Sequence, residues 1–198
     1  DTGNVAATVL SGIGATTGGV VTAANALTIT GTTEEITNAL VTESSLVVAS
    51  NESSAVTFVG DNPTGAELAA INPKVSGTIT LADVTQVFTG TAAQMQAAFS
   101  GGLAGTQTGA VTISDTEGTI TATTLTDITA QTNGTVTAAA AGITISGNTT
   151  QLTAALVTEE TKAVVANGAV SISDTGNVAA TVLSGIGATT GGVVTAAN

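Results

Sequence analysis

Short alternating stretches dominate the pattern of apolar and polar positions along the chain. In Val111-Thr112-Ile113-Ser114 and Val170-Ser171-Ile172-Ser173, a β-branched apolar residue alternates with a small hydroxyl residue. A period of two is typical of a strand with one buried face, so Val and Ile are expected to point inward and Thr and Ser outward. The pattern therefore predicts many short strands, each backed by a thin apolar layer.

A second pattern predicts short helices between these strands. One set of helices has Leu and Ile three positions apart, at Leu10/Ile13, Leu68/Ile71 and Leu125/Ile128. The other set has apolar pairs four positions apart, at Ile36/Leu40, Met95/Phe99 and Leu152/Leu156. Both spacings place the two side chains on one face of a helix.

Each helix of the second set is expected to begin with a capping box. In this motif the first side chain bonds the amide three residues on, and the Glu or Gln at that position reaches back. The predicted pairs are Thr32 with Glu35, Thr91 with Gln94, and Asn148 with Gln151.

Two series of glycines stand at fixed places relative to the helices and are expected to form structural turns. Gly19, Gly77 and Gly134 each follow the Leu of a first-set helix by nine residues. The second series directly precedes the capping boxes, and a shared geometry with positive φ is expected for it. Its members are Gly31, Gly90 and Gly147.

The order of these signals repeats along the chain. Aligning the strands that begin at Ala55, Ala110 and Ala169 gives internal units at 55–109, 110–168, and 169–198 continuing as 26–54. Residues 1–25 are also identical to residues 174–198, so the sequence has a long period of 173 residues. The strand before Asp174 has no counterpart before Asp1, and we therefore expect the chain to be a window of a longer tandem array.

The long period divides into half-units of about 29 residues, a length typical of one coil of a solenoid. Ordering an isolated half-unit costs about 1.5 kcal/mol per residue. Its few apolar side chains return only about 1.5–3 kcal/mol each, so it should fold only between neighbours. The predicted fold is an α/β solenoid of short parallel strands and short helices, one continuous segment over 1–198. An all-β antiparallel sandwich of repeats is the alternative.

Composition narrows the choice of partner. Hydrophobic residues make up 42% of the chain and aromatic residues only 2%, which suits thin repeated layers. The net charge is −12, with 2 basic and 14 acidic residues. Phosphate binding depends on Lys and Arg, so no nucleic acid partner is expected. No apolar run approaches the roughly 18 residues of a membrane span, so we expect no membrane insertion by this segment.

The chain offers little for catalysis. It contains no His, Cys, Tyr, Trp or Arg, which removes most general bases and most partners of a nucleophile. We expect no enzyme activity and no cofactor. The stretch 12–18 resembles a phosphate-binding glycine loop, but the sister units do not keep its glycines. A tight turn with small-residue packing is expected there instead.

Two minor binding functions stay open. Asp115 with Glu117, or Asp1 with Asn4, could supply oxygen ligands to calcium. No stretch has the dense Asp/Asn/Gly alternation of a calcium loop, so solvated surface carboxylates are preferred and no metal ligand is assigned. Recurrent Thr-x-Thr, as in Thr119-Ile120-Thr121, would suit an ice-binding solenoid. The alternative is that Thr is the β-branched residue that tolerates water.

The recurring motifs AVTISD, GTVTAA and ITISGNTTQLTAALVTEE resemble the tandem-repeat regions of giant bacterial cell-surface or secreted proteins. The chain is also similar to the Thr/Ala/Gly/Val-rich surface proteins of marine cyanobacteria. The resemblance covers essentially the whole chain and implies an exported structural protein, extracellular or at the cell surface. We expect a repeat segment of a long fibre or surface layer that associates with itself, through neighbouring repeats or copies. The alternative is the stalk of an adhesin whose ligand-binding part lies elsewhere.

Overall fold

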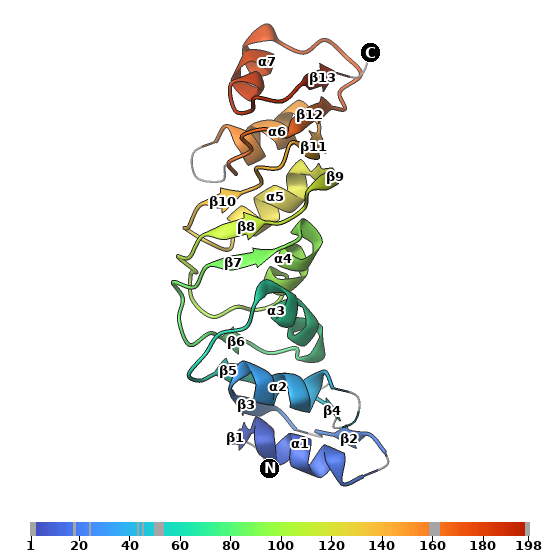
Figure 1. Ribbon diagram of the computed structural model, residues 1–198, viewed down its shortest axis with the longest axis vertical. Helices are drawn as coiled ribbons and strands as arrows, with labels where there is room; N and C mark the ends of the chain where they lie inside the picture. The colour runs from blue at the N-terminus through green and yellow to red at the C-terminus, as the bar shows by residue number, and fades with distance from the viewer. Residues whose placement is uncertain are drawn as a thin grey trace. The chain divides into compact units, whose positions relative to one another are not determined.

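The computed structural model describes residues 3–17, 19–23, 25–42, 44, 46–49, 54–158 and 163–196. Short helices alternate with short strands along the chain (Figure 1), which confirms the α/β class. The chain divides into two compact units. One comprises residues 1–86 and 97–106, and the other comprises residues 87–96 and 107–198. A helix together with its flanking strands is called a segment.

The first unit joins its segments by strand pairing and by helix contacts. Its elements are β1 (Gly3–Ala6), α1 (Ala7–Ala15), β2 (Val21–Thr22), β3 (Leu27–Gly31), α2 (Thr33–Leu40), β4 (Val47–Val48), β5 (Ala55–Phe58), α3 (Gly65–Ile71), the 3-10 helix η2 (Asn72–Lys74) and β6 (Ile79–Thr80). The strands pair in the orders β1-β3-β5-β6 and β2-β4. Helix α2 contacts both α1 and α3.

The second unit is built in the same way. Its elements are β7 (Phe88–Gly90), β8 (Val111–Ile113), β9 (Glu117–Thr121), α5 (Ala122–Thr129), β10 (Val136–Thr137), β11 (Gly142–Gly147), α6 (Thr149–Leu156), β12 (Ala169–Ile172), α7 (Ala180–Gly187) and β13 (Val194–Ala196). The strand orders are β10-β8-β7 and β13-β12-β11-β9, and α6 contacts both α5 and α7. Helix α4 (Ala92–Phe99) begins in this unit, and its residues from Ala97 onward belong to the first.

Strand direction tests the antiparallel alternative expected from the sequence. Every strand pair among the described residues is parallel, so the antiparallel sandwich is wrong. The alternation is confirmed in β8, where Val111 and Ile113 are buried and Thr112 is exposed. The predicted helix pairs are buried too, except Ile13, which is 47% exposed.

Strands and helices repeat with different spacings. Paired residues are 23 to 27 positions apart, as in Val56 with Ile79 and Thr28 with Ala55, whereas successive helices begin 26 to 32 positions apart. Along a ladder, the number of residues between a strand and the helix that follows it therefore increases from one segment to the next. Strand β1 runs directly into α1, Thr32 alone separates β3 from α2, and residues 59–64 separate β5 from α3. The predicted period of about 29 residues therefore matches the spacing of successive helices but not the spacing of paired strand residues.

The second glycine series serves a different purpose from the one expected. Gly31, Gly90 and Gly147 do not have positive φ, so that prediction is wrong. Positive φ occurs, among the described glycines, at Gly3, Gly60, Gly105 and Gly118. A Cβ on Gly31 would lie 2.8 Å from Glu35 Oε2, and one on Gly147 would lie 3.1 Å from Gln151 Oε1. These glycines therefore leave room for the side chain that folds back in the capping box.

The glycine-rich stretch 12–18 differs from the expected tight turn. Gly12 and Gly14 lie inside α1, where Gly14 is buried. Residue 18 lies outside the described residues. The local sequence continues the helix because Leu10 and Ala7 pack on the same face as Gly14, and packing of that face outweighs the low helix propensity of glycine.

Candidate functional site

The predicted capping boxes are present at the helix N-termini. Thr32 Oγ1 accepts a hydrogen bond from the Glu35 amide at 3.3 Å, and Glu35 Oε2 accepts one from the Thr32 amide at 2.9 Å. Reciprocal bonds also join Thr91 with Gln94, and Asn148 with Gln151. A further box, Thr64 with Glu67, was missed, although Thr64-Gly65-Ala66-Glu67 carries the sequence signal.

An aspartate of the next segment caps the same helices a second time. Asp115 Oδ2 accepts a hydrogen bond from the Ala92 amide at 2.6 Å, and Asp174 Oδ2 accepts one from the Thr149 amide at 2.7 Å. The third case is Asp61 with the Thr33 amide, at 2.9 Å. Each aspartate follows the strand that pairs with the one preceding the helix. A negative charge is favourable at a helix N-terminus, so each of these contacts stabilises the junction between two successive segments.

These contacts bear on the candidate calcium ligands. Asp115 is bound to a helix amide, whereas Glu117 and Asn4 are exposed on their strands and Asp1 lies outside the described residues. Within the described ranges, no group of three or more acidic side chains is placed to hold a metal ion.

Side chains also join successive segments near the C-terminal ends of the helices. Asn72 Nδ2 donates hydrogen bonds to the carbonyls of Ala97 at 2.7 Å and Ala98 at 3.3 Å, near the C-terminus of α4. Thr132 Oγ1 donates to the Gly109 carbonyl at 2.8 Å. Neither contact was predicted, because a lone Asn or Thr carries no periodic signal.

The first glycine series lies in bends that follow the helices. The Gly77 amide donates to the Ser54 carbonyl at 2.9 Å, and the Gly134 amide donates to Thr132 Oγ1 at 2.9 Å. A Cβ on Gly134 would collide with the Gly109 backbone, so close approach between segments requires glycine there. By contrast, a Cβ on Gly19 would meet nothing within 4 Å.

Hydroxyl side chains form one outward column along the ladder of β9, β11, β12 and β13. Its successive members are Thr121, Ser146, Ser171 and Thr195. The neighbouring column from Thr119 through Thr144 ends at Ala169. This ladder therefore carries one continuous outward column of hydroxyl side chains. The column next to it is not continuous, because alanine replaces the hydroxyl residue at position 169.

The two identical repeats form equivalent helices in different surroundings. We call residues 1–25 the N-terminal repeat and residues 174–198 the C-terminal repeat. In α1, the face formed by Ala7, Leu10 and Gly14 is buried, and α1 contacts α2. The matching residues of α7 are exposed or half-buried, namely Ala180, Leu183 and Gly187.

The other helix face behaves in the opposite way. Ile13 of α1 is 47% exposed and Val9 is 54% exposed. In α7, which contacts α6, the matching Ile186 is fully buried and Val182 is half-buried. The following segment therefore covers the Leu face of this helix, and the preceding segment covers the Ile face.

The strands of the two repeats use opposite edges. In β2, Val21 pairs with Val47 of the following segment. In β13, the matching Val194 pairs with Val170 of the preceding segment. The same short strand can therefore pair on both of its edges.

A threonine in the loop before this strand also has a different hydrogen-bond acceptor in the two repeats. Thr190 Oγ1 of the C-terminal repeat donates to the Gly168 carbonyl of the preceding segment. The matching Thr17 donates to the Gly19 carbonyl of its own loop, at 2.6 Å. Helix, strand and loop thus report the same difference between the two repeats.

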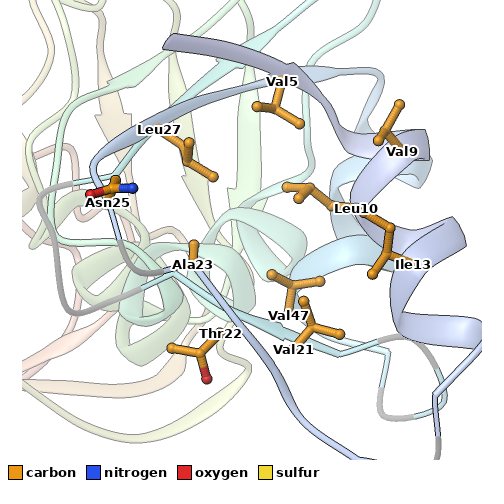
Figure 2. Close-up of a pocket in the computed structure, with 10 residues that line it drawn as sticks. All are labelled: Val5, Val9, Leu10, Ile13, Val21, Thr22, Ala23, Asn25, Leu27 and Val47. Atoms are coloured by element: carbon orange, nitrogen blue, oxygen red, sulfur yellow. The ribbon is translucent and has the colours of Figure 1, made fainter. Parts of the chain in front are cut away.

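The uncovered face of the N-terminal repeat forms an apolar groove of about 310 Å³. Figure 2 shows Leu10 and Ile13 of α1 directed toward Val21 and Val47 across this groove. In the C-terminal repeat, the residue matching Ile13 is buried against the preceding segment. The groove therefore marks the face that a preceding segment would cover.

None of the described helices is long and apolar enough to cross a membrane. Comparison with known protein families, curated proteins and solved structures gave no match to this chain.

Proposed function

We propose that the chain is a structural repeat segment of an α/β solenoid that forms a long fibre or surface layer outside the cell. The observation that carries this proposal is the complementary burial of the two identical repeats. One 25-residue sequence buries its Leu face in one place and its Ile face in the other. A segment with two complementary faces accepts a neighbour on each side, which is the requirement for a one-dimensional array.

Local contacts between successive segments support the proposal. Parallel ladders, aspartate caps and loop bonds all join residues that lie about one segment apart. Contacts of this kind can be repeated indefinitely, because none of them requires a residue from a distant part of the chain. The acidic surface and the scarcity of Lys suit a role in which reach and stiffness matter more than chemistry.

Small-angle X-ray scattering on chains lengthened by whole 173-residue periods tests the array. We expect the maximum dimension to grow in proportion to the number of periods while the cross-section stays constant. A cross-section that grows with each added period would contradict the proposal, because it would mean that the repeats collapse into a globule.

Electron microscopy of native material then separates the two roles. Continuous filaments or a regular coat support the fibre or layer. Isolated stalks that end in distinct tips support the second candidate, an adhesin stalk, which the resemblance of the repeat motifs also favours.

A further inference from the structure

We propose that copies of this chain associate side by side, with Lys74 of one copy bound in an acidic hollow of another. The hollow lies between the N-terminal turns of α2 and α3, and both the hollow and Lys74 belong to the first unit. This inference rests on the proposed function, since it supplies the lateral contact that a surface layer or a bundle of fibres needs. The occupant is a second copy of the chain.

The hollow is acidic and has a volume of about 300 Å³. Its wall carries the three carboxylates of Glu34, Asp61 and Glu67, and no basic side chain is among the described residues that line it. Two asparagine amides and two threonine side chains complete the wall. A concave surface lined by one sign of charge attracts the opposite charge, so the expected occupant is a cation.

Helix capping accounts for two of these three carboxylates. Asp61 and Glu67 each accept a hydrogen bond from a backbone amide at a helix N-terminus. Glu34 takes no part in the capping box of its helix. Its position is held by Ala93 in α4 and by Thr150 in α6, so the fold does not require a carboxylate there. The acidic hollow is therefore a feature of this segment and not a by-product of capping.

Two threonine hydroxyls on the wall of the hollow lack a hydrogen-bond partner. Thr33 is only 6% exposed, and neither its Oγ1 nor that of Thr37 bonds to a described group. Thr126 shows the usual alternative within a helix, since its hydroxyl donates to the Ala122 carbonyl at 2.9 Å. A buried polar atom without a partner is unfavourable, so a bound group that donates to these oxygens would stabilise the wall.

An ammonium group suits this hollow better than a metal ion does. Within the described ranges, no group of three or more acidic side chains is placed to hold a metal ion. A lysine ammonium carries three donors on a flexible stem. It can therefore bond to oxygens that lie too far apart to share one coordination sphere.

Lys74 is the described residue that can supply the ammonium group. The chain has only two basic residues, and the other one, Lys162, lies outside the described residues. Lys74 is exposed at the end of η2, which directly follows α3, and it forms no ion pair with a described residue. Its charge is therefore available to a second copy.

The contact is expected to act through repetition. A single ion pair near the surface binds weakly. In an array, each 173-residue period carries one hollow and one Lys74, so contacts between two neighbouring arrays act together and raise the apparent affinity. The tests therefore use chains lengthened by one whole period.

Zero-length cross-linking identifies the contact. A carbodiimide joins a lysine amine to a carboxylate in direct contact with it, and an equal mixture of isotopically labelled and unlabelled chains marks the links between molecules. We expect mixed-isotope peptides that join Lys74 to Glu34, Asp61 or Glu67. These peptides should be lost in Lys74→Gln and retained in the control Lys162→Gln.

Sedimentation velocity with two complementary variants gives an independent readout. We expect the parent to associate, and K74E and E34K each to stay monomeric. Mixing the two variants should restore association, because K74E keeps an intact hollow and E34K keeps Lys74. The control E117K makes the same charge change at an exposed carboxylate of the second unit, and should associate like the parent. Helical circular dichroism checks that each variant is folded.

Three results would overturn the proposal. A parent that stays monomeric and gives no mixed-isotope link would mean that the copies do not associate. Links that persist in Lys74→Gln but are lost in Lys162→Gln would assign the contact to the other lysine. Failure of the K74E and E34K mixture to associate would mean that the two groups are not partners. None of these results touches the array proposal, because scattering from dilute lengthened chains measures their growth in length separately.

Discussion

Asp115 shows how a single side chain connects successive segments. Its carboxylate accepts a hydrogen bond from the Ala92 amide, which is one of the helix amides that lack a partner within the helix itself. The aspartate reaches that amide because β8, which it follows, pairs with β7, which precedes the helix. Strand register and helix capping are therefore linked through one residue.

Replacing this carboxylate should weaken the junction. We expect Asp115→Ala to lower the free energy of unfolding by about 0.5–2 kcal/mol, the usual cost of losing a helix cap. Asp115→Asn retains an acceptor oxygen and should cost less. The control Glu117→Ala removes an exposed carboxylate nearby and should stay within about 0.5 kcal/mol of the parent in urea unfolding.

Asp83 provides a test of pH dependence. The Thr85 hydroxyl donates to Asp83 Oδ1 at 2.7 Å and the Thr85 amide donates at 2.8 Å. These bonds favour the ionised carboxylate, so they lower the pKa of Asp83, the hydroxyl contributing most. Their stabilising contribution is complete above the ordinary carboxyl pKa and is lost as the pH falls through the lowered value.

The hydroxyl can be removed or kept by substitution at position 85. In Thr85→Val we expect the pKa of Asp83 to rise toward its ordinary value, whereas Thr85→Ser should keep it low. Nuclear magnetic resonance titration of the Asp83 carboxyl carbon measures both. Equal pKa values in the two variants would show that the hydroxyl bond does not operate.

Glycine acts in two different ways, at Gly134 in a loop and at Gly12 in a helix. Gly134 lets two loops approach so closely that a Cβ would strike the Gly109 backbone, which cannot move aside as a flexible side chain can. Gly12, inside α1, has open space around the position of a Cβ. The same substitution should therefore have opposite effects at the two positions.

Gly134→Ala should destabilise the protein by about 1–3 kcal/mol, as overpacking does. Gly12→Ala should stabilise it by about 0.5–1 kcal/mol, because alanine is the better helix former. Thermal unfolding of the two variants, compared with that of the parent, measures both changes in stability. A loss of stability at Gly12→Ala would contradict the open surroundings described for α1.

The identical helices α1 and α7 form a matched pair for measuring burial. Ile186→Ala removes a fully buried side chain and should cost about 2–5 kcal/mol in α7. Ile13→Ala alters the same sequence where the side chain is 47% exposed, and should cost less than about 1 kcal/mol. Hydrogen exchange of the α7 and α1 amides resolves the two effects, and equal costs would contradict the assignment of faces.

Sequence patterns located most of these elements, because inward Val and Ile and paired Leu and Ile are set by burial, which has a fixed period. The purpose of Gly31 and Gly147 was misjudged, because it depends on where the Glu35 and Gln151 side chains fold. Strand register was not predicted either, since it is set by pairing between segments and not by the period of the helices. Asn72 could not have been found, because its partners become neighbours only after folding.

Within each of the two units, successive segments bury one another's side chains. Segments in the middle bury both Leu and Ile, as α3 does with Leu68 and Ile71 and α5 does with Leu125 and Ile128. The terminal repeats bury only one of the two residues fully. Context, and not sequence, therefore determines which residues of a repeat are core residues.

This dependence on context can be tested by extending the chain. In the 198-residue chain, Leu183→Ala should have a small effect because Leu183 is half-buried. When residues 26–198 are appended after residue 198, Leu183 gains a following segment and the same substitution should cost about 2–5 kcal/mol. Urea unfolding of both pairs of proteins gives the comparison, and an unchanged effect would contradict the stacking of successive periods.

The two faces of the terminal repeats also have a consequence for heredity. Unequal recombination between stretches of a gene that encode identical repeats would add or remove a whole period at once. Each such event would join a Leu face to the face that it already recognises, so the product would inherit a complete set of junctions. The gene could therefore change length in steps of 173 codons without passing through a misfolded intermediate.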